Sequence, residues 1–474
     1  MSAYVVLWFD VEDYIAPESD DALLWLLNLL SEMGIPATLK FVGERVRALQ
    51  RRRRNDILSL VRRSELFDVG YHTDMHSVHP TVAEYLDGLG WDEGIAEFER
   101  RERGGFDVVK EAFNKPVICY GQPGASWAPQ VYGALHRLGI PIYLDEGGHV
   151  GIDGTPFWYC GILTVYRMRQ NCTRINWGEP RRLESAIDRF ERLRRKMVGG
   201  DGRDGVVSIY FHECEFSTAE FWDGVNFANG VNTPKENWRM PRLLEADEAK
   251  RRMDDFKAYL AHIKDAEGCR FIRASELLEL MRDEAVGRRF RSDELVELAK
   301  ALLNGVSFKH IGGVWLSAAE CLLLLVRWLN TYYGGKFAEE VELPTQKLFG
   351  PKKVSGEVVK KAKLSCDGIL KACRELEGHM LSGGFIPDGV EVDGVALSPA
   401  QFAFACARCA IQLLSNHAEA IEVEEVVLQS EGCVDDSPDV WRWVIFPHGF
   451  YGRRLIGLAK LQCWTIKPAA FCAR

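Results

Sequence analysis

Short runs of apolar and β-branched residues alternate with longer helical patterns from residue 1 to about residue 280. A buried run at Tyr4–Phe9 is followed by an amphipathic pattern over Asp21–Met33. Further strand-like runs lie at 37–42, 67–71, 117–120, 140–144, 163–167, 206–211 and 270–273. This alternation is typical of parallel strands joined by crossover helices. About eight such strands favour a distorted (β/α) barrel, an α/β fold, over an open sheet, and functional side chains then follow the carboxyl ends of the strands.

Beyond residue 285 the strand-like runs become few and helical patterns dominate. Two segments, 305–320 and 389–401, each combine a short extended piece with an amphipathic helix that begins after Ser317 or Ser398. Serine at this position, with Glu or Gln three residues later, is typical of a capped helix start. The similarity of the two segments predicts an internal repeat, with coincidence between two capped helices as the alternative. We therefore predict two domains, a barrel over 1–285 and a mostly helical C-terminal domain over 286–474.

The charge and the apolar pattern limit the partners of this chain. A formal net charge of -9 argues against nucleic-acid binding, which depends on clustered positive charge. The basic run Arg51–Arg54 is better explained as a solvated helix face. No apolar run reaches the length that spans a membrane. The N-terminus lacks a signal-peptide pattern and the 13 cysteines are scattered, so we expect reduced thiols and a cytoplasmic location.

Ionisable residues with the chemistry of a metal site follow two of the predicted strands. Asp10, Glu12 and Asp13 come directly after the first strand, and like charges this close repel one another unless a cation neutralises them. His72 and His76 follow the third strand with a spacing that brings two imidazoles to one side of a turn. Two histidines and one carboxylate can hold a divalent ion and leave coordination positions open. A metal centre is therefore predicted at this edge of the sheet.

A third histidine ends a late strand. His212 follows the apolar run 206–211, in the same position relative to its strand as the other two groups. A histidine there can act as an acid, bind a metal or lie in the core. Its shared position with the two other strand ends favours catalysis.

Together these motifs resemble the polysaccharide deacetylases with NodB homology, a superfamily that includes carbohydrate esterase family 4. The resemblance covers about residues 4 to 280 and implies a catalytic base at Asp10 and an acid at His212. It also implies that His72 and His76 are metal ligands. The usual adjacent aspartate is replaced by Val11, so the carboxylate ligand is Asp13 or Glu12, and we favour Asp13.

The segment after the fourth strand resembles the third motif of the same superfamily. The usual arginine, which holds the base by a bidentate ion pair, is replaced by Gln122, and an amide brings no charge. Gln122, Pro123, Trp127 and Asp145 are the expected substrate-binding residues. Core packing is the alternative for Trp127, because most tryptophans are largely buried.

The resemblance implies a metal-dependent amide hydrolase that removes N-acetyl groups from an acetylated sugar or a glycan precursor. The alternatives are a cyclic-amide hydrolase similar to allantoinase and a catalytically degenerate glycan-binding protein. The expected cofactor is one divalent ion, zinc first, with cobalt, nickel or manganese as alternatives. The expected partner is a small-molecule or oligosaccharide substrate, with no nucleic acid and no membrane. We also expect the C-terminal domain to pack against the barrel or to form a homo-oligomer.

Overall fold

The computed structural model describes the chain except for residues 1, 146, 167–171, 199–203, 416–418 and 473–474. The described chain divides into two compact units that interleave in sequence. The first unit comprises residues 1–156, 164–280 and 436–453, and the second comprises residues 157–163, 281–435 and 454–474. The first unit thus includes a segment from near the end of the chain. Among the described residues, no helix is both long enough and apolar enough to cross a membrane.

A curled, mostly parallel sheet forms the centre of the first unit, so the expected mixed α/β fold is confirmed at this level. Its strands are β1 (Ala3–Val11), β2 (Ala37–Phe41), β3 (Phe67–Tyr71), β4 (Val117–Tyr120), β5 (Ile142–Asp145), β8 (Cys172–Thr173), β9 (Gly205–His212) and β10 (Cys269–Ile272). Their order is β5-β4-β3-β2-β1-β9-β8, and β10 pairs with the first half of β1. Within the described residues the sheet is a half-barrel, so the expectation of a closed or nearly closed barrel is met only in part.

Most of the predicted strands coincide with observed ones because they are apolar runs buried on both faces, whereas β10 is only partly buried. Every residue of β1, β2 and β3 is buried, as expected for parallel strands covered by helices. The run predicted at 163–167 corresponds to β7 (Ile162–Tyr166). Residue 167, the last of the predicted run, lies outside the described part of the chain.

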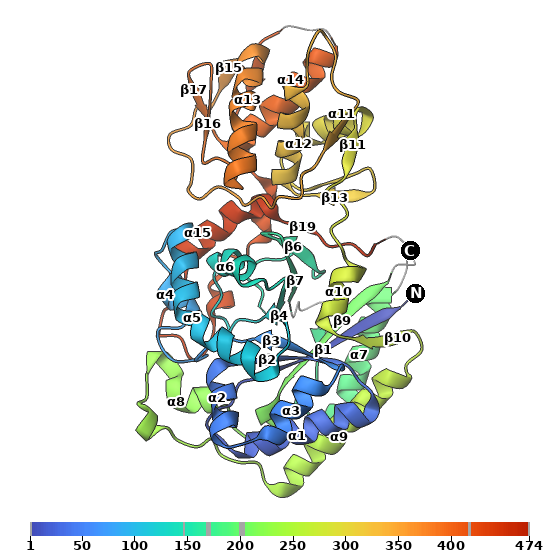
Figure 1. Cartoon of the computed structure of the whole chain (residues 1–474), viewed down its shortest axis with the longest axis vertical. Coiled ribbons are helices and arrows are strands. Elements are labelled where there is room, and N and C mark those ends of the chain that lie inside the picture. The colour runs from blue at the N-terminus through green and yellow to red at the C-terminus, as the bar shows by residue number, and fades with distance from the viewer. Residues whose placement is uncertain (1, 146, 167–171, 199–203, 416–418, 473–474) are drawn as a thin grey trace. The chain divides into compact units, whose positions relative to one another are not determined.

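Helices connect the strands and cover the sheet (Figure 1). They are α1 (Glu18–Met33), α2 (Gly43–Arg51), α3 (Asn55–Arg63), α4 (Val82–Leu86), α5 (Trp91–Phe113), α6 (Gln130–Leu138), α7 (Arg182–Val198), α8 (Trp222–Phe227), α9 (Ala246–Asp265) and α10 (Ala274–Leu280). Leu23, Leu26 and Leu30 place the apolar face of α1 in the core. The helix ends at Gly34, whose φ of 63° favours glycine.

The strand register places functional side chains at one edge of the sheet. Asp10 on β1 lies opposite Lys40 on β2 and opposite His212 on β9. His72 directly follows β3, and Asp145 is the last residue of β5. Because parallel strands end at the same edge, residues that are far apart in sequence meet there.

The second unit contains two consecutive segments with the same order of elements: strand, helix, β-hairpin, helix, strand. The first segment is β11 (Arg289–Arg291), α11 (Ser292–Leu303), β12 (Lys309–Ile311), β13 (Val314–Leu316), α12 (Ala318–Asn330) and β14 (Glu340–Glu342). The second is β15 (Ala362–Leu364), α13 (Cys366–Gly383), β16 (Val390–Val392), β17 (Val395–Leu397), α14 (Pro399–Leu414) and β18 (Ile421–Val423). In each segment the two outer strands pair antiparallel. Ser317 and Ser398 cap the helices after the hairpins, as the sequence predicts. We propose that this shared order reflects the predicted internal repeat.

The remaining elements of the second unit are short. β6 (Phe157–Tyr159) pairs antiparallel with β19 (Lys467–Pro468), and α15 (Arg453–Gln462) precedes β19. Lys467 on β19 is buried and forms ion pairs with Asp283 and Glu320. These ion pairs fix the last strand to α12 within the unit.

Candidate metal centre

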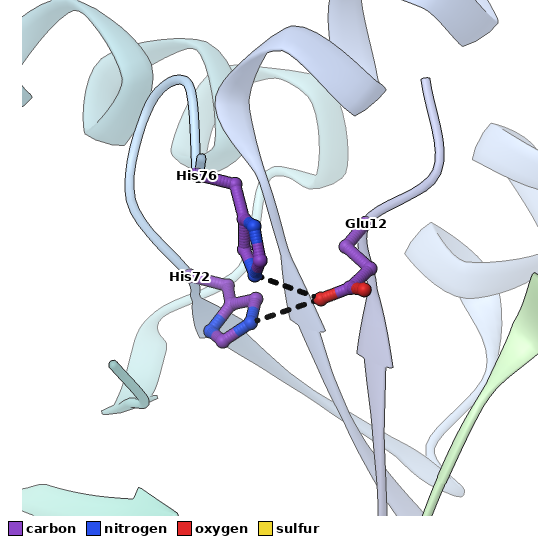
Figure 2. Close-up of side chains that lie close together, drawn as sticks. All are labelled: Glu12, His72 and His76. Carbon is purple, nitrogen blue, oxygen red and sulfur yellow. Dashed lines mark ion pairs between the residues drawn. The ribbon is translucent and has the colours of Figure 1, made fainter. Parts of the chain in front are cut away.

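Glu12, His72 and His76 form a buried group whose ligand atoms all lie within 4.8 Å of one another. Glu12 Oε2 lies 2.9 Å from His76 Nε2 and 3.4 Å from His72 Nε2. Figure 2 marks both ion pairs with dashed lines. Burial raises the pKa of the Glu12 carboxyl, but the histidines around it bring that pKa well below its ordinary value. A carboxylate and two imidazoles are a common ligand set for a divalent transition-metal ion.

The Nδ1 atom of each histidine forms a hydrogen bond that directs Nε2 toward Glu12. His72 Nδ1 donates to the carbonyl oxygen of Gly121 at 2.9 Å. His76 Nδ1 lies 2.6 Å from Ser77 Oγ, which in turn donates to Asp223 at 3.2 Å. A donor bond from Nδ1 leaves the Nε2 lone pair of a neutral imidazole available for a metal. The outer partners therefore support the same interpretation as the ligand set.

The carboxylate of the group belongs to Glu12 and not to Asp13, which the sequence analysis favoured. Trp222 Nε1 donates to Glu12 Oε1 at 3.2 Å and orients that side chain. The Asp13 carboxylate instead accepts hydrogen bonds from the backbone of Ile15 and Ala16, and from Ser19 Oγ at 2.7 Å. These bonds shape the turn that leads into α1. Asp13 thus stabilises the turn before α1, and the geometry favours the alternative ligand Glu12.

Asp10 lies between His72 and His212. Its two carboxylate oxygens are 3.7 Å from His72 Nε2 and 3.8 Å from His212 Nε2, respectively. Burial raises the pKa of Asp10, but electrostatic interactions with His72, Lys40 and His212 bring it below the ordinary value. Asp10 is therefore a carboxylate at neutral pH, as a proton acceptor must be.

The His212 ring is oriented by the Glu215 carboxylate, which contacts the ring nitrogen that points away from Asp10. His212 Nδ1 lies 2.7 Å from Glu215 Oε1, on the short 3-10 helix η1 (Glu213–Phe216). Glu215 is itself held by Arg174 and by Trp177 Nε1. Burial lowers the pKa of His212, but Glu12, Glu215 and Asp10 raise it to about 10. His212 is therefore protonated at neutral pH and can act as a proton donor.

The expected substrate-binding residues lie near this edge, but they do not all face it. Gln122 donates to Gly124 O at 3.0 Å and accepts from Tyr143 Oη at 2.9 Å. The Trp127 ring is 1% exposed and stacks on His149 at 5.1 Å, so burial favours core packing for Trp127. Pro123 is buried in the turn that begins at Gly121. Asp145 is buried and lies 3.4 Å from Lys40 Nζ.

Two features of the site were not anticipated from the sequence. Lys40, a lysine in the middle of the buried strand β2, lies against Asp10. A charged residue inside an apolar run was the available signal. The second feature is the segment 436–453, which brings Trp443 edge-on to His76 with 5.8 Å between the ring centroids. The Trp443 ring also packs against Gly124, where a side chain would overlap it. No local sequence pattern indicates this contact.

Comparisons with known proteins were made at three levels. No family model matches the chain, and no curated protein matches it. Similar solved structures include a CE4 family pseudoenzyme from Bacillus anthracis, with 14% identity, coverage of 58% of this chain and 66% of that chain, and a TM-score of 0.33. A putative polysaccharide deacetylase from Mycobacterium smegmatis has 13% identity, coverage of 59% and 89%, and a TM-score of 0.38. PuuE allantoinase has 13% identity, coverage of 58% and 88%, and a TM-score of 0.37. Similarities at this level establish neither an activity nor a substrate for this chain.

Proposed function

We propose that this chain is a metal-dependent amide hydrolase that removes N-acetyl groups from an acetylated sugar or a glycan precursor. The observation that carries the proposal is the position of Asp10. Its carboxylate lies between the ligand His72 and the proton donor His212, beside the Glu12–His72–His76 group. A base, an acid and a metal-binding group thus share one strand edge, and amide hydrolysis requires all three functions.

Glu12, His72 and His76 would hold the ion. Three protein ligands leave a coordination position open, which is typical of catalytic sites and not of structural ones. Zinc suits this mixed nitrogen and oxygen set best, and cobalt, nickel and manganese are the alternatives. When bound, such an ion supplies Lewis acidity, which polarises a carbonyl and makes water a stronger acid.

Asp10 and His212 supply the two proton transfers of the reaction. Asp10 accepts the proton of the attacking water, because its pKa lies below its ordinary value and it is ionised at neutral pH. His212 donates a proton to the departing amine nitrogen, because its pKa is raised to about 10. Glu215 keeps His212 Nδ1 engaged and turns Nε2 toward Asp10 and the substrate. Acetate and a free amine are the products.

Metal content tests the ligand assignment without any choice of substrate. We expect about one equivalent of divalent metal in the purified protein by elemental mass spectrometry, as one ligand group implies. His76→Ala is expected to lose that metal. His79→Ala is the matched control, because His79 lies three residues away but bonds Glu84 and the Phe227 carbonyl. Absence of metal from the wild type, even after incubation with added ions, would overturn the proposal and favour a non-catalytic binding protein.

Turnover tests the roles of the acid and the base. The wild type is expected to release acetate from at least one N-acetylated sugar, in a panel that also contains cyclic amides. His212→Ala is expected to keep the metal and lose turnover, because His212 is not in the ligand group. Equal metal loss in His212→Ala and His76→Ala would refute the separate roles. Hydrolysis of cyclic amides alone would keep the reaction class and replace the substrate.

A further inference from the structure

Lys40 is a buried lysine near the carboxyl end of β2, and its ammonium faces the proposed base. It lies on β2 opposite Asp10 in the strand register, and its side chain has no exposed surface. Nζ lies 2.8 Å from Asp10 Oδ1, 2.8 Å from the Leu144 carbonyl oxygen and 3.4 Å from Asp145 Oδ2. The two histidines beside Asp10 are farther away, at 3.7 Å for His72 and 3.8 Å for His212. Lys40 is thus the nearest charged partner of the Asp10 carboxylate among the described residues.

The surrounding chain leaves room for this lysine and no more. A Cβ on Gly121 would overlap Lys40 Nζ, and a Cβ on Gly70 would come within 2.8 Å of Lys40 Cγ. On another side the ammonium lies 4.1 Å from the centroid of the Trp8 ring, a distance at which cation and ring attract. Gly70 therefore confines the stem of the side chain, and Gly121 and the Trp8 ring confine the ammonium. A buried charge held this tightly also fixes the group it pairs with.

The residue in the third motif does not hold the base. The Gln122 amide forms its hydrogen bonds with Gly124 and Tyr143 and not with Asp10. The positive charge beside Asp10 therefore comes from β2, the neighbouring strand of the sheet. Burial lowers the pKa of Lys40, but Asp10 and Asp145 raise it above the ordinary value, so the ammonium stays charged.

We propose that Lys40 is a positioning residue of this site, which holds the Asp10 carboxylate between His72 and His212 in the orientation that accepts a proton. This inference rests on the proposed amide hydrolase function. It differs from a purely structural role, in which Lys40 only neutralises two buried carboxylates. A neutralising role depends on net charge, whereas a positioning role depends on the contact between Lys40 and Asp10.

Replacing both members of the Lys40–Asp145 ion pair with uncharged residues separates the two roles. Lys40→Met alone would leave Asp10 and Asp145 buried without a cation, and this can prevent folding. Asp145→Asn combined with Lys40→Met removes one charge of each sign, so the net charge of the buried site is unchanged. Asp145→Asn alone is the reference. Lys115→Met is the control for loss of a partly buried lysine, since Lys115 Nζ donates to the carbonyl oxygens of Ser64 and Phe67, away from Asp10.

The positioning role predicts a specific change in kinetics. The double variant should keep its metal, change KM less than about threefold and lose about 100-fold in kcat, because a misplacement near 1 Å has such an effect. This loss is expected both relative to the wild type, whose buried site has the same net charge, and relative to Asp145→Asn, which also lacks the Asp145 carboxylate. A kcat for the double variant within threefold of Asp145→Asn would overturn the proposal.

A crystal structure of the double variant gives a readout that does not depend on the activity. The Asp10 carboxylate should leave its place between His72 and His212 in the double variant and keep that place in Asp145→Asn. An unmoved Asp10 would overturn the positioning role. If the wild type binds metal but hydrolyses no amide, the proposed function fails, and this structural comparison still decides the role of Lys40.

Discussion

The packing of Ile445 yields a quantitative prediction about the end of the chain. Ile445 belongs to the segment 436–453 of the first unit and is 0% exposed. It lies in a buried cluster with Tyr14, Trp222 and Phe227, among others. Trp222 from this cluster donates to Glu12, so the cluster supports the proposed ligand from behind. We expect Ile445→Ala to destabilise the protein and to loosen this support.

The size of the effect follows from complete burial. Ile→Ala removes three carbon atoms, which at about 0.8 kcal/mol each gives a transfer loss of about 2.4 kcal/mol. The residual cavity adds to this loss, so the total falls within the range of about 2–5 kcal/mol measured for such core truncations. Ile445→Val should cost about 0.5–1.5 kcal/mol. Val444, the preceding residue, is 58% exposed, and Val444→Ala should change stability by no more than about 0.5 kcal/mol.

Denaturant unfolding of the metal-free proteins measures these differences. Metal is left out because a ligand that binds only the folded state would mask part of the loss. A stability of Ile445→Ala equal to that of Val444→Ala would refute the reasoning, because it would mean that the segment 436–453 is not part of the folded core. Under the prediction, a truncated chain that ends at residue 285 loses this support together with Ile445.

Two further predictions concern the site itself. Glu12→Gln should abolish stoichiometric metal binding in elemental analysis, whereas Asp13→Asn should retain the metal and only lower stability, because Asp13 bonds the backbone before α1; loss of metal in Asp13→Asn alone would reverse the assignment. Glu215→Gln should lower the pKa of His212 from about 10, because Glu215 is one of the carboxylates that raise it against burial. His212 must stay protonated to act as the acid, so the alkaline fall of kcat/KM should move to lower pH in Glu215→Gln, and an unchanged profile would contradict the role of His212.

Much of the fold and of the site follows from local sequence patterns. The apolar runs identify the parallel strands because both faces of such strands are buried. His72 and His76 are found from their spacing after β3, and His212 from its place at the end of β9. In each case the signal is contained within a few consecutive residues. Such signals depend on backbone geometry that is nearly the same in every parallel strand.

The carboxylate ligand could not be settled in this way. Glu12 and Asp13 are adjacent and chemically similar, and the choice between them depends on the contacts that each side chain makes in the folded chain. The short Asp13 side chain accepts hydrogen bonds from the backbone N–H groups of Ile15 and Ala16, which point toward it in the turn before α1. The longer Glu12 side chain is fixed by Trp222, a residue 210 positions away in sequence. The assignment of Glu12 as the proposed ligand therefore depends on a tertiary contact.

The place of Lys40 shows why a missing motif residue is weak evidence against catalysis. From the sequence, Gln122 in place of an arginine indicates that Asp10 lacks a cationic partner. In the structure a cation reaches Asp10 from β2, because the register of a parallel sheet brings the same edge position of neighbouring strands together. A cation on another strand can thus form the ion pair with the same carboxylate. A pattern within one segment shows only that the arginine is absent at position 122. The positive charge of Lys40 beside Asp10 is found only by comparing neighbouring strands. The combined replacement of Lys40 and Asp145 tests whether this charge has a function.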